Sequence, residues 1–225
     1  MSWFESLIEL DKQLLLWGNS FHTPFWDNFI SIFSGKLIWI PTALVLLYVI
    51  IRTEKRDSWW VLLFLVITIV LADQISSGII KPLVARWRPT HEPTLQGMVQ
   101  LVHGYTGGRY GFVSSHAANS FAVALFTSLL FRRQLYTWTI FLWATANVYT
   151  RIYLGVHYPL DILGGAIVGL ACGWFSFYLM QRIKPQLRQR MDDIMLDKGI
   201  YLIISVLIIS VAVIAIGNNF LLFLA

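Results

Sequence analysis

Six stretches of this chain are almost free of charged residues, and each approaches the length of about 20 residues that a helix needs to cross a lipid bilayer. Charged residues make up only 13% of the 225 residues and hydrophobic residues 57%, whereas soluble domains are roughly 25% charged. Too few polar side chains remain to cover a globule in water, which excludes a soluble enzyme, a disordered chain and a nucleic-acid-binding protein. The pattern predicts one domain over residues 1–225, an all-α polytopic membrane helix bundle with six transmembrane helices. The spans are expected near Phe25–Ile51, Trp59–Ile80, His116–Phe131, Leu135–Tyr153, Pro159–Met180 and Gly199–Phe223.

The first twenty residues have a different pattern. Glu5, Glu9, Asp11 and Lys12 are spaced among large apolar residues, which predicts an amphipathic helix lying on the membrane surface. Acidic residues precede the apolar part and no basic segment is present, so a cleavable signal peptide is not expected. The single Cys172 excludes an internal disulfide.

Basic residues are unevenly divided between the loops, and this bias orients the bundle. The loops after the first, third and fifth spans carry ten Lys and Arg, and the other face carries seven. The positive-inside rule places the first group in the cytoplasm and both termini on the opposite side. For a bacterial protein, this predicts the inner membrane with the second face toward the periplasm. The ten residues are Arg52, Lys55, Arg56, Arg132, Arg133, Arg182, Lys184, Arg188, Arg190 and Lys198.

The longest segment without span character is Lys81–Ser115, which is rich in Pro and Gly and is expected to form a structured, functional loop. Three polar clusters lie in or after it, over residues 81–89, 111–116 and 150–161. With six spans, all three clusters reach the outer face of the membrane. The motif-bearing core therefore extends from Lys81 to Asp161.

The residue types in these clusters suggest phosphoryl transfer. Lys and Arg bind phosphate oxygens through charge-assisted hydrogen bonds, and His titrates near neutral pH. Asp161 follows His157 by four residues, so a helix that begins near Tyr158 would let the carboxylate reach the imidazole. Such a His is a nucleophile or base, and a second His can act as acid toward a leaving oxygen. The cations are Lys81, Arg88 and Arg151, and the two histidines are His116 and His157.

Each of these residues also has an ordinary structural interpretation. A basic residue at a membrane edge is usually an interfacial anchor, and Asp161 could simply cap a helix. A histidine in a loop is usually solvated, and His22, His91 and His103 are assigned to that class. The ordinary interpretation does not explain why the other residues gather on one face.

The three clusters resemble the motifs of the type 2 phosphatidic acid phosphatase superfamily, which also includes lipid phosphate phosphatases and vanadium haloperoxidases. Its first motif is Lys, six residues, then Arg-Pro; its second is Pro-Ser-Gly-His; its third is Ser-Arg, five residues, His, three residues, Asp. This sequence departs from the pattern at Val113, Ser115 and Thr150, none of which removes a charged or proton-transferring group. The matching residues are Lys81, Arg88, Pro89, Ser114, His116, Arg151, His157 and Asp161.

The resemblance implies a role for each matching residue. His157 is expected to be the nucleophile with Asp161 as its partner, and His116 the acid and then the base. A phosphate pocket is expected from Lys81, Arg88, Ser114 and Arg151. The resemblance implies no metal and no cofactor, and a reaction that proceeds through a phosphohistidine.

Two alternatives and the substrate stay open at this stage. Polar residues within spans, Asp73, Gln74 and Asn147, would suit a transporter, and a vanadate-dependent haloperoxidase relative would use the same pocket. A phosphatase at the membrane edge would act on a lipid or isoprenoid phosphate. The candidate substrates are undecaprenyl diphosphate, lipid A and phosphatidylglycerophosphate. The expected partners are this substrate and the bilayer, with no nucleic acid, and the sequence does not determine the oligomeric state.

Overall fold

The computed structural model describes residues 2–188 and 193–224, and the described residues form helices and loops without a β-strand. Arg190, one of the basic residues that orient the bundle, lies outside this part of the chain. A π-helical segment, Gln74–Ile80, joins α4 to α5. The α-helices are α1 (Trp3–Gly18), α2 (Pro24–Phe33), α3 (Ile40–Glu54), α4 (Ser58–Asp73), α5 (Lys81–Val84), α6 (Ser115–Phe131), α7 (Gln134–Tyr153), α8 (Pro159–Ile183) and α9 (Asp193–Leu224).

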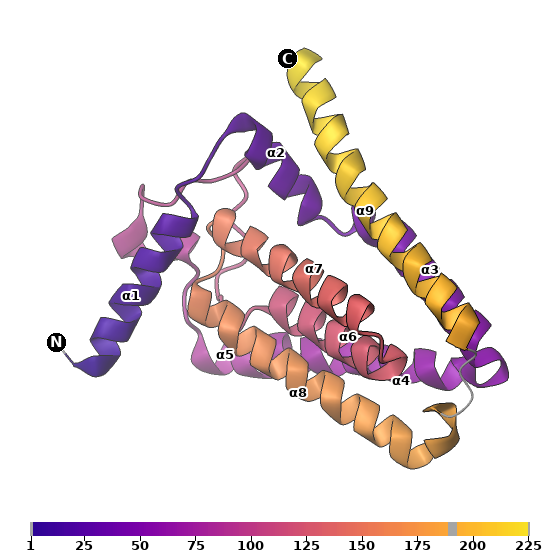
Figure 1. The fold of residues 1–225 in the computed structure, drawn as a ribbon. Helices are drawn as coiled ribbons and strands as arrows, with labels where there is room; N and C mark the ends of the chain where they lie inside the picture. The colour runs from indigo at the N-terminus through magenta and orange to yellow at the C-terminus, as the bar shows by residue number, and fades with distance from the viewer. Residues whose placement is uncertain (1, 189–192, 225) are drawn as a thin grey trace.

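The centre of the bundle is the packed pair α6 and α8, with α4 and α7 beside it (Figure 1). Helix α8 presents Gly165, Gly169 and Gly173 at intervals of four residues. A Cβ atom at Gly169 or Gly173 would collide with the backbone of Ala118 or Ala122 on α6. Small residues at this spacing let two helices approach closely, which is how helices associate inside membranes. This contact fixes the start of α6 against the start of α8.

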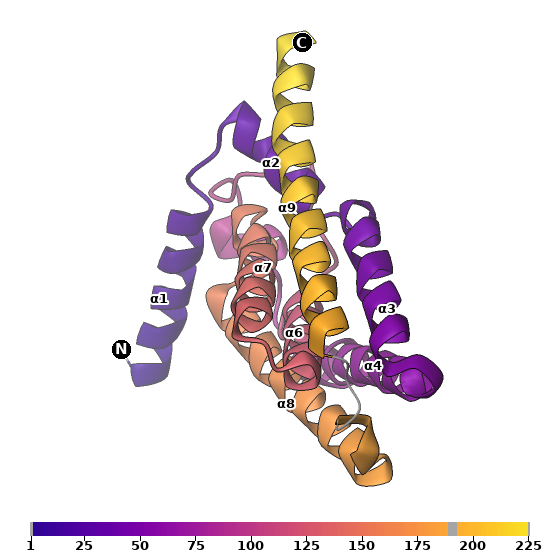
Figure 2. The same cartoon turned by 45° about the vertical axis from the view of Figure 1, so that its right-hand side comes forward.

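A second layer consists of α3 and α9, which lie side by side in both views (Figures 1 and 2). Buried apolar residues from α3, α4, α6, α7, α8 and α9 form one continuous core, including Ile50, Phe126, Tyr136 and Ile203. The C-terminal part of α9 extends beyond the other helices (Figure 2). The polar clusters lie at the end of the bundle where α7 ends and α8 begins.

The chain is a membrane protein, but six spans are not confirmed. Among the described residues, three stretches are long and apolar enough to cross a bilayer: Leu37–Val84, Pro159–Ile183 and Ile194–Asn218. The first contains α3 and α4, which meet at the turn formed by Lys55 with a φ of 49°. Helix α6 is apolar but shorter.

The prediction of one continuous span over Phe25–Ile51 is wrong. Helix α2 begins at Pro24, after its N-cap Thr23, and ends at Phe33. Ser34 and Gly35 then turn the chain before α3, and the Arg151 guanidinium donates a hydrogen bond to the Ser34 hydroxyl at 2.6 Å. Hydropathy alone does not reveal this break, because the apolar residues continue on both sides of it.

The N-terminal segment is helical, α1, and packs against α7 and α8, whereas its position on the membrane surface stays a prediction. Its start is capped by Ser2, whose hydroxyl accepts from the Glu5 N–H. Trp3 and Phe4, near its start, are exposed. Asp11, by contrast, is 2% exposed and points into the protein.

Candidate active site

The two ends of the long loop pair with each other and bring the first two motifs together. Trp87 and Tyr110 form an isolated antiparallel bridge, and the Gly111 N–H donates to the Arg86 carbonyl at 2.8 Å. The loop starts at Ala85, whose left-handed conformation (φ 48°) ends α5. The first motif thus lies against the residues that lead into α6.

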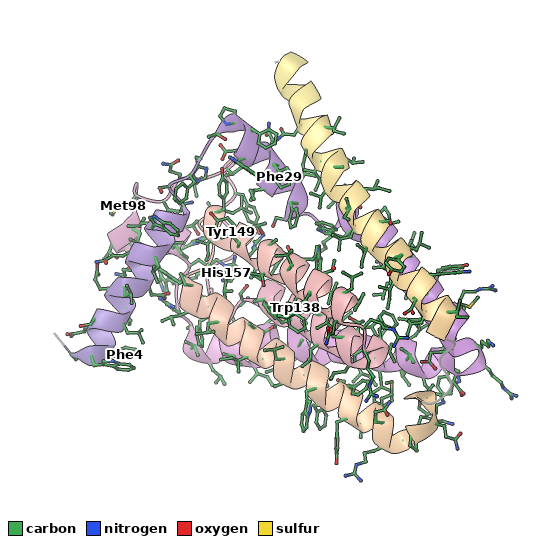
Figure 3. All side chains as sticks on the ribbon, viewed as in Figure 1. Phe4, Phe29, Met98, Trp138, Tyr149 and His157 are labelled. Atoms are coloured by element: carbon green, nitrogen blue, oxygen red, sulfur yellow. The ribbon has the colours of Figure 1, made fainter. Side chains whose placement is uncertain are left out.

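The third motif forms at the junction of α7 and α8, and Figure 3 shows His157 in the interior at this junction. Helix α8 starts at Pro159, so Asp161 lies in its first turn. The Asp161 Oδ2 atom accepts from the Tyr158 N–H at 3.0 Å and lies 3.3 Å from His157 Nδ1. The carboxylate therefore caps the helix and contacts the imidazole, as the four-residue spacing predicts. With the Nδ1 proton directed at the carboxylate, Nε2 carries the lone pair.

The surroundings of His157 keep its imidazole neutral. Burial lowers the pKa of His157 well below its usual value, and the positive charges of Arg88, Arg151 and Lys81 lower it further. A hydrogen bond with the Gly111 backbone opposes this effect in part. Only the neutral form has a lone pair for attack on phosphorus, so this environment suits a nucleophile.

Two buried guanidinium groups lie beside His157. Arg88 donates through Nε to the Tyr110 carbonyl at 3.1 Å, and Arg151 donates to Ser34 and to the Tyr105 hydroxyl, the latter at 3.0 Å. Burial and the charge of Arg151 lower the pKa of Arg88. Within the described part of the chain, Arg88 Nη1 and Arg151 Nε are buried without a hydrogen-bond partner. Unsatisfied buried donors on adjacent cations are costly unless an anion binds there.

The serines of the second motif divide their roles. The Ser114 hydroxyl is the N-cap of α6 and accepts from the Ala117 N–H at 3.4 Å, so it stabilises the helix start. The Lys81 ammonium instead donates to the Ser115 hydroxyl at 3.4 Å. The predicted phosphate residue Ser114 is therefore fully buried beneath the site, and Ser115 lies against the lysine. Both serines lie at the N-terminus of α6, a 17-residue helix, and the free N–H groups and dipole at a helix N-terminus favour an anion there.

His116 and Arg151 face a polar cleft of about 460 Å³ between α2, the long loop and the start of α6. The structure thus brings the predicted residues to one end of the bundle, with both histidines near the same cations. The cleft adds residues that the sequence interpretation left out. These are Ser31, Ser34, Gly35, Lys36, Val102, His103, Tyr105 and Leu154.

A further arginine, Arg86, binds the Asp161 oxygen that does not contact His157, and the sequence interpretation gave this arginine no role in the site. Arg86 donates to Asp161 Oδ1 at 3.0 Å through one nitrogen and to Asp11 Oδ2 at 2.7 Å through another. Its guanidinium lies 3.9 Å from the centre of the Tyr158 ring. Arg86 could have been noted as a third cation of the first motif, but nothing in the pattern around Asp11 pointed to the site.

The donor set facing the site consists of cations and imidazoles. Among the described residues, no group of three or more His, Cys, Asp and Glu gathers in a way that could hold a metal ion. The positive charges of Lys81, Arg88 and Arg151 favour an anion at this site.

The model of the PAP2 superfamily matches residues 59–185. The lipid A 4'-phosphatase of Bacteroides thetaiotaomicron is 38% identical over 223 residues, covering 92% of this chain and 98% of the relative. The lipid A 4'-phosphatase of Porphyromonas gingivalis is 36% identical, covering 79% of this chain and 77% of the relative. The undecaprenyl-diphosphatase of Sulfolobus acidocaldarius is 32% identical, with coverage of 68% and 67%. The crystal structure of Aquifex aeolicus LpxE superposes with a TM-score of 0.61 at 26% identity, covering 75% of this chain and 95% of that one.

Proposed function

Because the chain belongs to the PAP2 superfamily and is a phosphatase, we propose that it removes a phosphate group from a membrane glycolipid of the lipid A type through a phosphohistidine on His157. One observation carries this proposal. The buried His157 imidazole contacts the Asp161 carboxylate, the Arg88 and Arg151 guanidinium groups beside it each have an unpartnered N–H, and Arg151 lines a polar cleft together with His116.

The chemistry would proceed in two steps. His157 Nε2 attacks phosphorus, the bond from phosphorus to the lipid oxygen breaks, and His116 gives a proton to that oxygen. His116 then takes a proton from water as the water oxygen attacks phosphorus, and the nitrogen–phosphorus bond breaks to release inorganic phosphate. Asp161 stabilises the positive charge on the imidazole, and Lys81, Arg88 and Arg151 stabilise the phosphoryl oxygens.

The size and lining of the cleft support a substrate with a large polar headgroup. About 460 Å³ lies in the range of pockets that enclose whole small molecules, roughly 300–1,000 Å³. Hydroxyl groups from Ser31, Ser34 and Tyr105 line it, and such groups can bind sugar hydroxyls. The names of two relatives, both lipid A 4'-phosphatases, support the same substrate class.

A second candidate substrate is undecaprenyl diphosphate. Lys36 lines the cleft as a further cation and could bind a second phosphate group. The name of the Sulfolobus relative supports this candidate. A prenyl diphosphate has no headgroup beyond its phosphates, so it would leave the hydroxyl-lined part of the cleft without contacts.

The deciding experiment is phosphate release by the full chain in detergent, with EDTA present, from lipid A, undecaprenyl diphosphate and phosphatidylglycerophosphate. We expect the highest kcat/KM on lipid A. The Lys36→Ala variant should lower it more than Lys12→Ala, because Lys36 lines the cleft whereas the Lys12 ammonium donates to the Thr94 hydroxyl outside the cleft lining. Preference for undecaprenyl diphosphate would contradict the headgroup assignment, and no phosphate release from any of the three lipids would contradict the proposed substrate class.

The six spans and a site facing the periplasm also belong to this proposal. Lys55, Arg56, Arg132 and Arg133 lie in the α3–α4 and α6–α7 connections, which supports a cytoplasmic position for them. In a Cys172→Ala background, Gly108→Cys should react with a membrane-impermeant maleimide in intact cells, because Gly108 is exposed in the long loop. Arg56→Cys should react only after lysis, and the opposite pattern would invert the protein.

A further inference from the structure

We propose that Asp11, on α1, is a positioning residue for phosphoryl transfer: through Arg86 it holds the Asp161 carboxylate in the orientation that the His157 imidazole requires. The proposal rests on the function proposed above, because it assigns Asp161 a role in turnover. It adds to the site a residue that lies 48 positions before the start of the segment matched by the family model, residues 59–185.

The contacts form one unbroken chain from α1 to the imidazole. Asp11 Oδ2 accepts from Arg86 at 2.7 Å, Arg86 donates to Asp161 Oδ1 at 3.0 Å, and Asp161 Oδ2 lies 3.3 Å from His157 Nδ1. The side chains of Asp11 and Asp161 are 1% and 0% exposed, so water does not screen these interactions as it would on a surface. Two carboxylates and the ring of Tyr158 fix one guanidinium in place.

Asp11 is itself anchored to the helix that carries Asp161. Its Oδ1 atom accepts from the Leu160 N–H at 2.9 Å, in the first turn of α8. The same carboxylate thus ties α1 to the start of α8 and directs Arg86 toward the next residue of that turn. Because both carboxylates bind the Arg86 guanidinium, its N–H group is directed at Asp161 in one orientation. An arginine bound to a single carboxylate could rotate and would not fix that orientation.

The charge of Asp11 has a second consequence. Arg86 stabilises Asp161 but also opposes the positive charge that forms on His157 when its nitrogen bonds to phosphorus. A second carboxylate on Arg86 offsets part of this positive charge, so Asp161 keeps its effect on the imidazole. Loss of the Asp11 charge should therefore weaken the transition state more than the binding of substrate.

A double-mutant cycle tests whether Asp11 acts through Asp161. We expect Asp11→Asn to lower kcat about 10–100-fold with KM nearly unchanged, by analogy with the loss seen when residues that orient metal-binding histidines are altered. The expected kcat of Asp11→Asn/Asp161→Asn is close to that of Asp161→Asn alone, because the second change removes the group through which the first acts. Arg86→Lys keeps the charge but lacks the fork, and it should lower kcat as Asp11→Asn does.

The matched control is Lys12→Ala, the next residue of α1, whose ammonium donates to the Thr94 hydroxyl at 3.0 Å and so ties α1 to the loop without a contact to Asp161. This variant should keep the wild-type kcat, and circular dichroism and thermal unfolding verify that all variants are folded. Wild-type kcat in both Asp11→Asn and Arg86→Lys, or full additivity with Asp161→Asn, would overturn the positioning role. Wild-type kcat in Asp161→Asn would instead contradict the proposed mechanism itself.

Discussion

Substitution of Gly111 by alanine should lower the activity of the site although no charged residue is replaced. A Cβ atom there would lie 2.8 Å from Asp161 Oδ2 and 3.3 Å from Arg88 Cγ. Oδ2 is the atom that contacts His157 Nδ1 and accepts from the Tyr158 N–H. To reach ordinary contact at 3.4 Å, the carboxylate must move by about 0.6 Å, away from a position fixed by Arg86 and the helix start.

The expected loss follows from that displacement. Misplacement of a catalytic group by about 1 Å can lower a rate about 10²-fold, so Gly111→Ala should lower kcat about 10–100-fold. Stability should change little, because Gly111 does not have a positive φ and Gly→Ala at a compatible position contributes about 0.4–1 kcal/mol through the unfolded chain, which offsets part of the clash.

The control lies three residues earlier in the same loop. Gly108 also lacks a positive φ, and no atom lies within 4 Å of a Cβ built there. Phosphate release should therefore be unchanged in Gly108→Ala, with kcat and KM measured side by side for both variants. If Gly111→Ala turned over lipid phosphate at the wild-type rate, the close packing of the backbone against Asp161 would have no catalytic meaning.

The other predictions concern the nucleophile, the acid, the cations and the pH profile. His157→Ala should abolish phosphate release, whereas His116→Ala should lose about 10²–10⁴-fold but still form the phosphohistidine, detectable by rapid quench, from a substrate with a good leaving group. Vanadate should inhibit the enzyme and Arg151→Ala should weaken that inhibition, because a trigonal-bipyramidal anion gains most from fixed cations; undiminished turnover in saturating vanadate would contradict this. Since burial and neighbouring cations lower the pKa of His157 well below 6.5, its imidazole should stay neutral on mild acidification and remain able to act as the proposed nucleophile. The acid limb of the pH profile of kcat/KM should accordingly lie below pH 6.5. A limb at or above that value would show that burial and the nearby cations do not lower the pKa of His157.

Local sequence spacing predicted the parts of the site that depend on one turn of helix. The distance of four residues between His157 and Asp161 becomes a contact because α8 begins between them, at Pro159. The start of α6 at Ser115 likewise follows from the polar residues that precede an apolar run. Such features are encoded within a few residues, so no knowledge of the remaining chain is needed to infer them.

The break between α2 and α3 was missed because the span was predicted from hydropathy alone. The Ser34-Gly35 dipeptide is a local turn signal, but the contact that holds the turn is tertiary, since the Arg151 guanidinium on α7 donates to the Ser34 hydroxyl. The break places Lys36 in the cleft beside the site, where a continuous helix would have continued the apolar span. A hydropathy profile averages over this turn because leucine, isoleucine and tryptophan follow it directly, at Leu37–Trp39.

Asp11 illustrates the same limit for charge. On an amphipathic helix, an acidic residue beside Lys12 is expected to face water, and the pattern gives no sign that Asp11 faces inward. Burial of that carboxylate requires a cation and a backbone donor, which come from Arg86, 75 residues later, and from Leu160, 149 residues later. A buried charge is stable only when such partners are in place, so the position of α1 depends on the assembled loop and on the start of α8. The position of the N-terminal helix and the orientation of the Asp161 carboxylate are therefore coupled, and a substitution at either end of this network should alter the other end.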